Sequence, residues 1–329
     1  MGRGGPANLV GVVMDADRVA LGVLKAAKRC RWAARFVPME RRFDLWRELE
    51  NHRQREELDE TFFEERLRIF QSAMCETPGW AGSILVVAMP DPAFRIRFEW
   101  HDREVALTVP PTFIHANTRG ESQAIDLLAG HGVRAETAVL PKKLLAARCG
   151  LTKYGRNGIT YREGLGSYHR ICCLYTEIPC DQGVWKTPEA LDSCASCGAC
   201  VQACPAGAIE SEGFRVRAER CLTYWQEKPA GIPYPEELDF SWQEQFIGCL
   251  RCQAACPQNR GRLTTEEAGP PFSAEETARL LRGAGAEELP EETVGKLKQH
   301  DILEYLDVLP RNLEASLRNA HRFRAQGNA

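Results

Sequence analysis

Two runs of cysteines carry the clearest chemical signal in the sequence. The first run has the spacing C-x2-C-x2-C-x3-C-P and comprises Cys194, Cys197, Cys200, Cys204 and Pro205. The second run comprises Cys221, Cys249, Cys252, Cys256 and Pro257. This spacing is typical of [4Fe-4S] ligands, and in two-cluster proteins the fourth cysteine of such a run ligates the other cluster. The spacing therefore predicts one cluster on Cys194, Cys197, Cys200 and Cys256, and a second on Cys204, Cys221, Cys249 and Cys252.

Structural zinc and disulfides are the alternatives for these cysteines. Zinc also uses C-x2-C pairs, but a zinc site needs four ligands and has no use for the x2-x2-x3-Pro progression. Closely spaced cysteines in an intracellular chain are more typical of metal or redox ligands than of disulfides. We therefore expect two iron–sulfur clusters.

Length and composition narrow the function classes. A chain of 329 residues is long enough for about two domains, and 44% apolar with 26% charged residues is ordinary for a soluble protein. A net charge of -3 predicts no general affinity for nucleic acid. The N-terminus does not resemble a signal peptide, and no run approaches the roughly 18 apolar residues of a membrane span. Together with reduced cysteines, these features predict a cytoplasmic protein without membrane contact.

The segment before the cysteines has the patterns of a mixed α/β region. The apolar run Ser83 to Met89 predicts a strand covered on both faces, and Glu104 to Val109 predicts a second strand. Apolar residues recur with helical spacing in Asp59 to Met74. We also expect a helix over Gly120 to Leu128 and a solvated helical face in Arg41 to Glu60.

A short helix and two glycine-rich loops precede the first cysteine run. Lys142 to Cys149 predicts the helix, which ends at Gly150. Glycines in the following loops permit close approach to a ligand or to another backbone, and a pair of tight turns is the alternative. No nucleotide-binding fingerprint is present. The loops contain Tyr154, Gly155, Arg156 and Asn157, then Gly166, Ser167 and Tyr168.

The C-terminal region has a helical pattern. Pro270 and Pro271 predict a linker, and Ser273 with Glu276 predicts a capping box. Helices are expected between the breakers Gly283, Gly285, Pro290 and Pro310, over Ala274 to Gly283, Glu291 to Leu306 and Arg311 to Arg322. Scattered arginines in the last segment are typical of a solvated basic face, namely Arg311, Arg318, Arg322 and Arg324.

Residues 80 to 260 resemble epoxyqueuosine reductase and its relatives, the cobalamin-dependent iron–sulfur reductases that also resemble reductive dehalogenases. The resemblance extends well beyond the cysteines and includes the strand from Ser83, Ala135 to Ala138 leading into Leu144 to Asn157, and Gly166 to Glu177. Its most specific stretches are Cys194 to Ile209, Arg220 to Tyr224, Ile232 to Leu238 and Ile247 to Asn259. The stretch from Leu309 to Ala320 is similar to a helical-repeat segment of the tRNA-modifying enzyme.

The resemblance implies an α/β (α+β) corrinoid-binding-like domain, a two-cluster ferredoxin-like domain and a short helical tail, over residues 1–185, 186–265 and 270–329. It also implies a cobalamin held between the first two domains. An external donor such as flavodoxin or ferredoxin would load the outer cluster, and the inner cluster would pass single electrons to cobalt. Because the chain is slightly acidic and its tail is short, we expect weak or absent tRNA binding.

Some of the family's site residues match residues of this sequence, and others are replaced. Glu136 occupies the position of the family's catalytic aspartate, so it is the candidate general acid; an exposed acid at a helix entry is the alternative. In relatives, loops that match Tyr154, Gly155, Arg156 and Asn157, and Gly166, Ser167 and Tyr168, lie near the corrinoid. These residues are the candidate cofactor contacts.

Departures from the family pattern put the substrate in doubt. The family's Arg-Asp-Tyr-His motif has no counterpart, and the nearest region contains His115, which we expect to be a packed or surface histidine. Cys172, Cys173 and Cys180 lie outside the cluster spacing and are expected to be buried as small apolar residues. Two functions remain open: a corrinoid-dependent reductase, and an electron-transfer protein without cobalamin that donates electrons to a protein partner.

Overall fold

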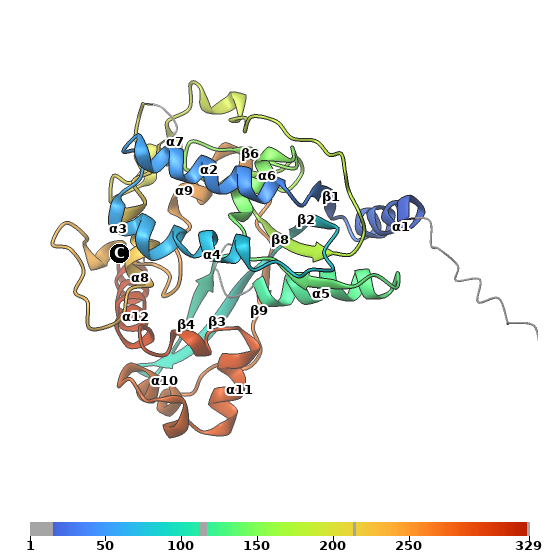
Figure 1. The fold of residues 1–329 in the computed structure, drawn as a ribbon. Helices are drawn as coiled ribbons and strands as arrows, with labels where there is room; N and C mark the ends of the chain where they lie inside the picture. Colours follow the sequence, from blue (N-terminus) through green and yellow to red (C-terminus); the bar gives the residue numbers. More distant parts are fainter. Residues whose placement is uncertain (1–15, 112–116, 213–214, 328–329) are drawn as a thin grey trace, which may run out of the picture.

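A four-stranded antiparallel sheet forms the first layer of the molecule (Figure 1). The computed structural model describes residues 16–111, 117–212 and 215–327. The sheet has the order β1-β2-β8-β5, and every neighbouring pair is antiparallel. Its strands are β1 (Ala33–Pro38), β2 (Ser83–Pro90), β5 (Ala135–Thr137) and β8 (His169–Thr176).

Helices cover both faces of this sheet (Figure 1). Alternate side chains of β2 point to opposite faces, so Leu85 and Val87 pack with one helical layer while Ile84 and Val86 pack with the other. The helical layer that packs with Leu85 and Val87 comprises α1 (Ala16–Arg29) and α5 (Asn117–Ala129). The helical layer on the other face comprises α2 (Arg41–Gln54), α4 (Ile69–Cys75) and α6 (Lys142–Arg148). The prediction that Ser83 to Met89 is a strand buried on both faces is confirmed, because each of its residues is buried.

The helical prediction for Asp59 to Met74 is confirmed, with an interruption. Asp59 caps α3 (Glu60–Phe62), a π-helical turn follows over Phe63–Leu67, and α4 continues the path. A π turn shifts the helical register, so the apolar residues do not share one face. Phe63 is buried, whereas Ile69 is 58% exposed.

A second sheet joins segments that lie far apart in the sequence. The predicted strand from Glu104 is confirmed as β4 (Arg103–Val109), which pairs with β3 (Ala93–Trp100). On its other edge, β3 pairs in parallel with β9 (Thr265–Glu267).

The predicted helices over Arg41 to Glu60, Gly120 to Leu128 and Lys142 to Cys149 are confirmed as α2, α5 and α6.

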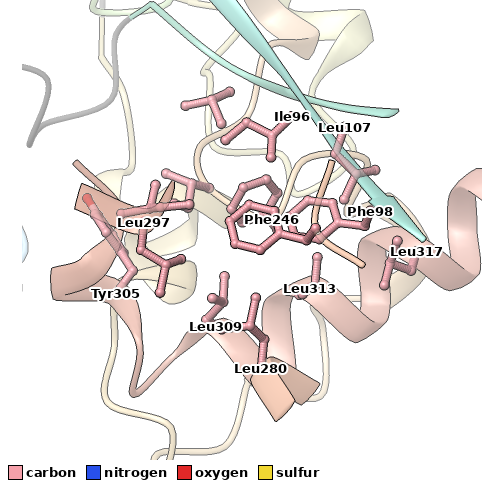
Figure 2. Packing of buried hydrophobic residues seen from close by; sticks show 14 of the residues in the cluster. Ile96, Phe98, Leu107, Phe246, Leu280, Leu297, Tyr305, Leu309, Leu313 and Leu317 are labelled. Atoms are coloured by element: carbon pink, nitrogen blue, oxygen red, sulfur yellow. The ribbon is translucent and has the colours of Figure 1, made fainter. Parts of the chain in front are cut away.

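The C-terminal helices pack against the second sheet and are integral to a core rather than an isolated tail. Phe98 lies at the centre of this core, with its ring 5.0 Å from that of Phe272 and 5.7 Å from that of Phe246 (Figure 2). The helices are α10 (Ala274–Leu281), α11 (Glu291–Gln299) and α12 (Leu309–Gly327). The predicted capping box of Ser273 and Glu276 is confirmed. Pro310 does not separate helices, because it lies in the first turn of α12, where its missing N–H is tolerated.

The prediction of a solvated basic face on the last helix is wrong for Arg311. Its guanidinium donates to the carbonyl oxygens of Trp225 and Lys228 at 3.2 and 2.9 Å, which ties α12 to the cysteine-rich segment. Arg318 is exposed as expected and pairs with Glu314. The side chains of Arg322 and Arg324 lie outside the described residues.

The cysteine-rich segment contains little regular secondary structure. Its α-helices are α7 (Ala199–Ala203), α8 (Leu222–Gln226) and α9 (Arg251–Ala254), and the preceding loops carry β6 (Lys153–Tyr154) and β7 (Thr160–Tyr161). Among the described residues, none of the helices combines the length and the apolar character needed to cross a membrane.

Candidate double-cluster site

Short helices and turns position the eight cysteines of the two runs. Cys200 lies in α7 and Cys252 in α9, and these two helices contact each other. Cys221 precedes α8, and Cys256 precedes a turn that begins with Pro257. All eight cysteines are free and partly buried. The eight thiols therefore lie on helices and turns that are too short to form a hydrophobic core.

Two of the thiols have charge partners in the other cysteine run. Cys200 has Cys194 and Cys256 as electrostatic neighbours. Cys252 has instead Cys249, Cys221 and Cys204 as neighbours. The full crossed grouping stays a prediction. We define site A as Cys194, Cys197, Cys200 and Cys256, and site B as Cys204, Cys221, Cys249 and Cys252.

Three thiols of site B have raised pKa values. Burial raises the pKa of Cys249 to about 11 and that of Cys252 to about 12, and it also raises the pKa of Cys221. No three His, Cys, Asp or Glu side chains among the described residues gather closely enough to hold a single metal ion. Binding of iron by either group would require the thiols to be deprotonated.

The first glycine-rich loop contacts the cysteine-rich segment. Arg156 donates to the carbonyl oxygens of Ser211 and Cys194 at 2.8 and 2.9 Å. Asn157 donates to the hydroxyl of Tyr161 at 3.0 Å. A Cβ at position 155 would collide with the Tyr161 ring, so Gly155 permits the loop to close. Tyr154 lies in β6, and its backbone N–H donates to Glu189.

The second loop is fixed to the end of the second cysteine run. The backbone N–H of Ser167 donates to Asn259 Oδ1 at 2.8 Å, and its hydroxyl donates to Gln253 Oε1 at 2.8 Å. Gly166 has a φ of +61°, and a Cβ there would collide with Asn259. Tyr168 is buried, and the charges of Cys256 and Cys252 help to raise its pKa after the larger effect of burial. These residues thus brace the cluster segment; as corrinoid contacts they stay a prediction.

Two residues that contact the first glycine-rich loop escaped the sequence analysis. Tyr161 accepts a hydrogen bond from Asn157 at 3.0 Å, and burial raises its pKa. Lys143 donates to the carbonyl oxygen of Gly158 at 3.2 Å. The available signal was position alone, since Tyr161 lies between the two glycine loops and Lys143 adjoins the matched segment from Leu144.

Glu136 lies in β5, opposite Tyr175 of β8, and is exposed. The alternative of an acid at a helix entry is wrong, because α6 begins only at Lys142. Its charge makes a minor contribution to the raised pKa of the buried Tyr175, which burial dominates. The role of Glu136 as a general acid stays a prediction.

The predictions for the cysteines outside the two runs, and for His115, differ in outcome. Cys172 and Cys173 are buried in β8 as expected, and burial raises the pKa of Cys172 to about 12. Cys180 is only partly buried, and its thiol donates to the carbonyl oxygen of Gln182 at 3.1 Å. His115 lies outside the described residues.

Two cavities open on the surface of the described residues. One, of about 430 Å³, is lined by Thr152, Tyr161, Gly166 and Gln258, among others, and so lies at the second glycine-rich loop. The other, of about 220 Å³, is lined by Asp91, Arg119 and Arg170.

Comparisons of sequence relate the chain to one group of enzymes. Residues 193–259 match the family model of a 4Fe-4S double cluster binding domain. The epoxyqueuosine reductase of Staphylococcus aureus is 30% identical over 132 residues, which cover 40% of this chain and 33% of that protein. That of Escherichia coli is 35% identical over 135 residues, covering 40% and 34%. The matches thus span about a third of the curated relatives.

Comparisons of structure extend the similarity to most of the chain. A selenomethionine-labelled epoxyqueuosine reductase matches with a TM-score of 0.57 and 18% identity, covering 93% of this chain and 83% of that one. The Bacillus subtilis enzyme with its catalytic loop swung out of the active site matches with a TM-score of 0.57 and 19% identity, covering 93% and 82%. The chain therefore shares the fold of the epoxyqueuosine reductases, and its residues 193–259 match a 4Fe-4S double cluster binding domain.

Proposed function

We propose that the chain is an iron–sulfur reductase that passes single electrons from an external donor, through clusters at sites A and B, to an electrophile. The crossed grouping of the thiolates carries this proposal, because it gives two neighbouring clusters from one continuous segment. Each cluster takes up and releases one electron, so neighbouring clusters suit stepwise electron transfer. A zinc site would have no such redox role.

The contacts between the two glycine-rich loops and the cysteine-rich segment support an enzyme over a free-standing electron carrier. Arg156 donates to the carbonyl oxygen of Cys194, and Ser167 is hydrogen-bonded to Asn259 and Gln253. Residues around a metal ligand orient it and limit its contact with water. A small ferredoxin would not need a second domain for this purpose.

Epoxyqueuosine in tRNA is the substrate to test first. A related epoxyqueuosine reductase, with a TM-score of 0.53 and 17% identity, has been solved with an epoxyqueuosine-modified tRNA stem loop. A smaller electrophile is the alternative, favoured by the slightly acidic net charge of -3, since phosphate binding needs clustered Lys or Arg. A flavodoxin or ferredoxin would suit as donor.

A corrinoid is implied by the relation to epoxyqueuosine reductases. When bound, it would supply a low-valent cobalt centre for the reductive step. Of the loop residues expected to contact it, Arg156 and Ser167 hydrogen-bond the cluster segment. We therefore assign no step to it, and the proposal concerns electron delivery alone.

The alternative function is electron transfer to a protein partner. The exposed position of Glu136 favours this alternative, because a general acid works best where burial raises its pKa toward the working pH. If Glu136 donates a proton, Glu136→Gln should abolish turnover while cluster content is unchanged. If the chain is a carrier, the variant should transfer electrons at the wild-type rate.

The function is tested by single-turnover reduction under anaerobic conditions. Reconstituted protein is incubated with dithionite and an epoxyqueuosine-modified tRNA stem loop, with and without cobalamin, and queuosine is measured by mass spectrometry. We expect product from the wild type and none from Cys252→Ala, which lacks a ligand of site B. Absence of product in both conditions, with both clusters present, would reject this substrate; failure to reduce the clusters would reject the reductase itself.

A further inference from the structure

The chain between Cys221 and Cys249 is long and mostly irregular. We call residues 222–248 the linking segment. Its regular elements are α8 at its start and a 3-10 turn over Phe240–Trp242 towards its end. Closing a loop of this length costs conformational entropy, so contacts with other parts of the molecule must fix the distance between its ends. The helix α12 supplies such contacts.

Asn312, near the start of α12, hydrogen-bonds both ends of the linking segment. Its side-chain amide donates to the carbonyl oxygen of Gln226 at 2.9 Å. Its backbone carbonyl oxygen accepts a hydrogen bond from the side chain of Gln243 at 2.8 Å. Asn312 is 1% exposed and Gln243 is fully buried, so water does not compete for these bonds. One residue of α12 thus closes the linking segment.

Both ends of the linking segment lie next to the cysteines that it joins. α8 begins directly after Cys221, whose carbonyl oxygen accepts from the backbone N–H of Tyr224 at 3.0 Å. At the end of α8, the side chain of Gln226 donates to the carbonyl oxygen of Gln245 at 2.8 Å. Gln245 shortly precedes Cys249 in the sequence. Contacts that join the two ends therefore limit the separation of the two thiols.

Two further residues of α12 hold the same ends of the linking segment. The guanidinium of Arg311 donates to carbonyl oxygens at the end of α8, among them that of Gln226 at 3.3 Å. The amide of Asn319 donates to the carbonyl oxygens of Phe240 and Gln243, each at 2.8 Å. Buried carbonyl oxygens need donors, and an irregular segment supplies few of its own. The polar residues of α12 therefore replace the hydrogen bonds that regular structure would provide.

α12 is a rigid support for these contacts. Its Leu313 and Leu317 are fully buried in the core around Phe98 (Figure 2). A side chain holds its partner precisely when packing fixes the element that carries it. The apolar residues of α12 thus anchor the helix to the second sheet, while its polar residues hold the linking segment.

We infer that Asn312 is a positioning residue for cluster binding, because it closes the linking segment and so sets the separation of Cys221 and Cys249. Thiolates share one cluster only at separations that its irons can span, and each thiol loses its proton when it binds iron. The inference rests on the proposed function in taking these two cysteines as ligands of one cluster. It is independent of whether Cys204 and Cys256 cross between the runs.

The chain offers a matched control and a second route to the same contact. Ser316 is fully buried one helical turn after Asn312, and among the described residues its hydroxyl has no hydrogen-bond partner. Ser316→Ala therefore alters a buried polar residue of α12 without removing a contact to the linking segment. Gln243→Leu removes the donor to the Asn312 carbonyl oxygen and leaves α12 itself unchanged.

The experiment isolates each cluster in the full chain with cysteine variants. Cys194→Ala with Cys197→Ala removes two ligands of the first run, so this background keeps the cluster that binds Cys221 and Cys249. Cys221→Ala with Cys249→Ala gives the converse background. Both backgrounds isolate one cluster whichever way the fourth ligands are shared.

Asn312→Leu, Gln243→Leu and Ser316→Ala are introduced into both backgrounds. The proteins are reconstituted anaerobically with iron and sulfide. Iron content is measured, and the dithionite-reduced proteins are compared by electron paramagnetic resonance, which reports on the surroundings of the cluster directly. Because Gln243→Leu does not alter α12, it decides the outcome if Asn312→Leu disturbs the helix as a whole.

In the background that keeps Cys221 and Cys249, we expect about four irons per chain without a further change and with Ser316→Ala. Asn312→Leu and Gln243→Leu should each retain less than about one iron and lose the signal of the reduced cluster. The converse background should keep about four irons with Gln243→Leu.

Two results would overturn the inference and leave the proposed function standing. One is full retention of iron by Gln243→Leu in both backgrounds, and the other is an equal loss in both. A background that keeps Cys221 and Cys249 but binds no cluster even with Asn312 and Gln243 in place would instead overturn the proposed function together with the inference.

Discussion

The four-stranded sheet and the cysteine-rich segment are each stabilised by a different kind of interaction. The sheet buries every residue from Ser83 to Met89 between two helical layers. The cysteine-rich segment has α-helices of five residues or fewer, and single hydrogen bonds such as that from Arg156 to Cys194 fix it to its neighbours. Apolar burial can stabilise the sheet alone, whereas helices this short need tertiary contacts or metal. The clusters are therefore expected to be structural as well as redox-active.

The largest effect should follow removal of iron. With a chelator and an oxidant, we expect amide protection to be lost through residues 194–260 and retained in β2 and β8, because metal binding supplies much of the folding free energy of small metal sites. Hydrogen exchange with mass spectrometry measures this. Equal loss in both regions would show that the sheet depends on the clusters, and full retention in both would show that neither does.

A smaller effect is expected from opening the core between the second sheet and the C-terminal helices. Phe98→Ala should lower the free energy of unfolding by about 3 to 5 kcal/mol, because it removes a fully buried ring and leaves a cavity. Ile69→Ala is the control, since Ile69 is 58% exposed and should change stability by no more than about 0.5 kcal/mol. Urea denaturation compares the two variants, and similar losses would show that burial does not decide stability here.

The stability of the protein should depend on pH through His169, which lies where β8 meets the glycine-rich loops. Its ring contacts the Thr160 hydroxyl at 3.2 Å and the Gly166 carbonyl oxygen at 3.1 Å, and burial lowers its pKa to about 4. Between about pH 6.5 and 4 the unfolded chain binds a proton that the folded protein excludes, so stability should fall with falling pH. The full loss is about 3 kcal/mol at about 1.36 kcal/mol per pH unit.

His169→Gln separates this effect from other acid-sensitive groups. The variant should lose the additional pH dependence between about pH 6.5 and 4, even if its stability at neutral pH also changes. Denaturation of both proteins across this range provides the measurement. Parallel curves for the two proteins would show that His169 titrates normally in the folded chain.

The sequence was informative where chemistry or packing is local. The apolar run from Ser83 was enough to predict β2. The spacing of the cysteines predicts the crossed thiolate groups, which stay a prediction. The partner of β3 was not predictable, because β9 comes from residues 265–267 and pairs across a long separation. The contacts of Arg156 with Cys194 and of Ser167 with Asn259 were not predictable for the same reason, since only the folded chain brings these residues together.

The most direct test of the account is the iron content of two double variants, which report on the crossed pairing of the cysteines. Cys194→Ala with Cys256→Ala removes two ligands of site A, so we expect about four irons to remain of about eight. Cys194→Ala with Cys204→Ala removes one ligand from each site, so we expect both clusters to be lost. The reverse outcome, with about four irons in the second variant and none in the first, would contradict the crossed arrangement.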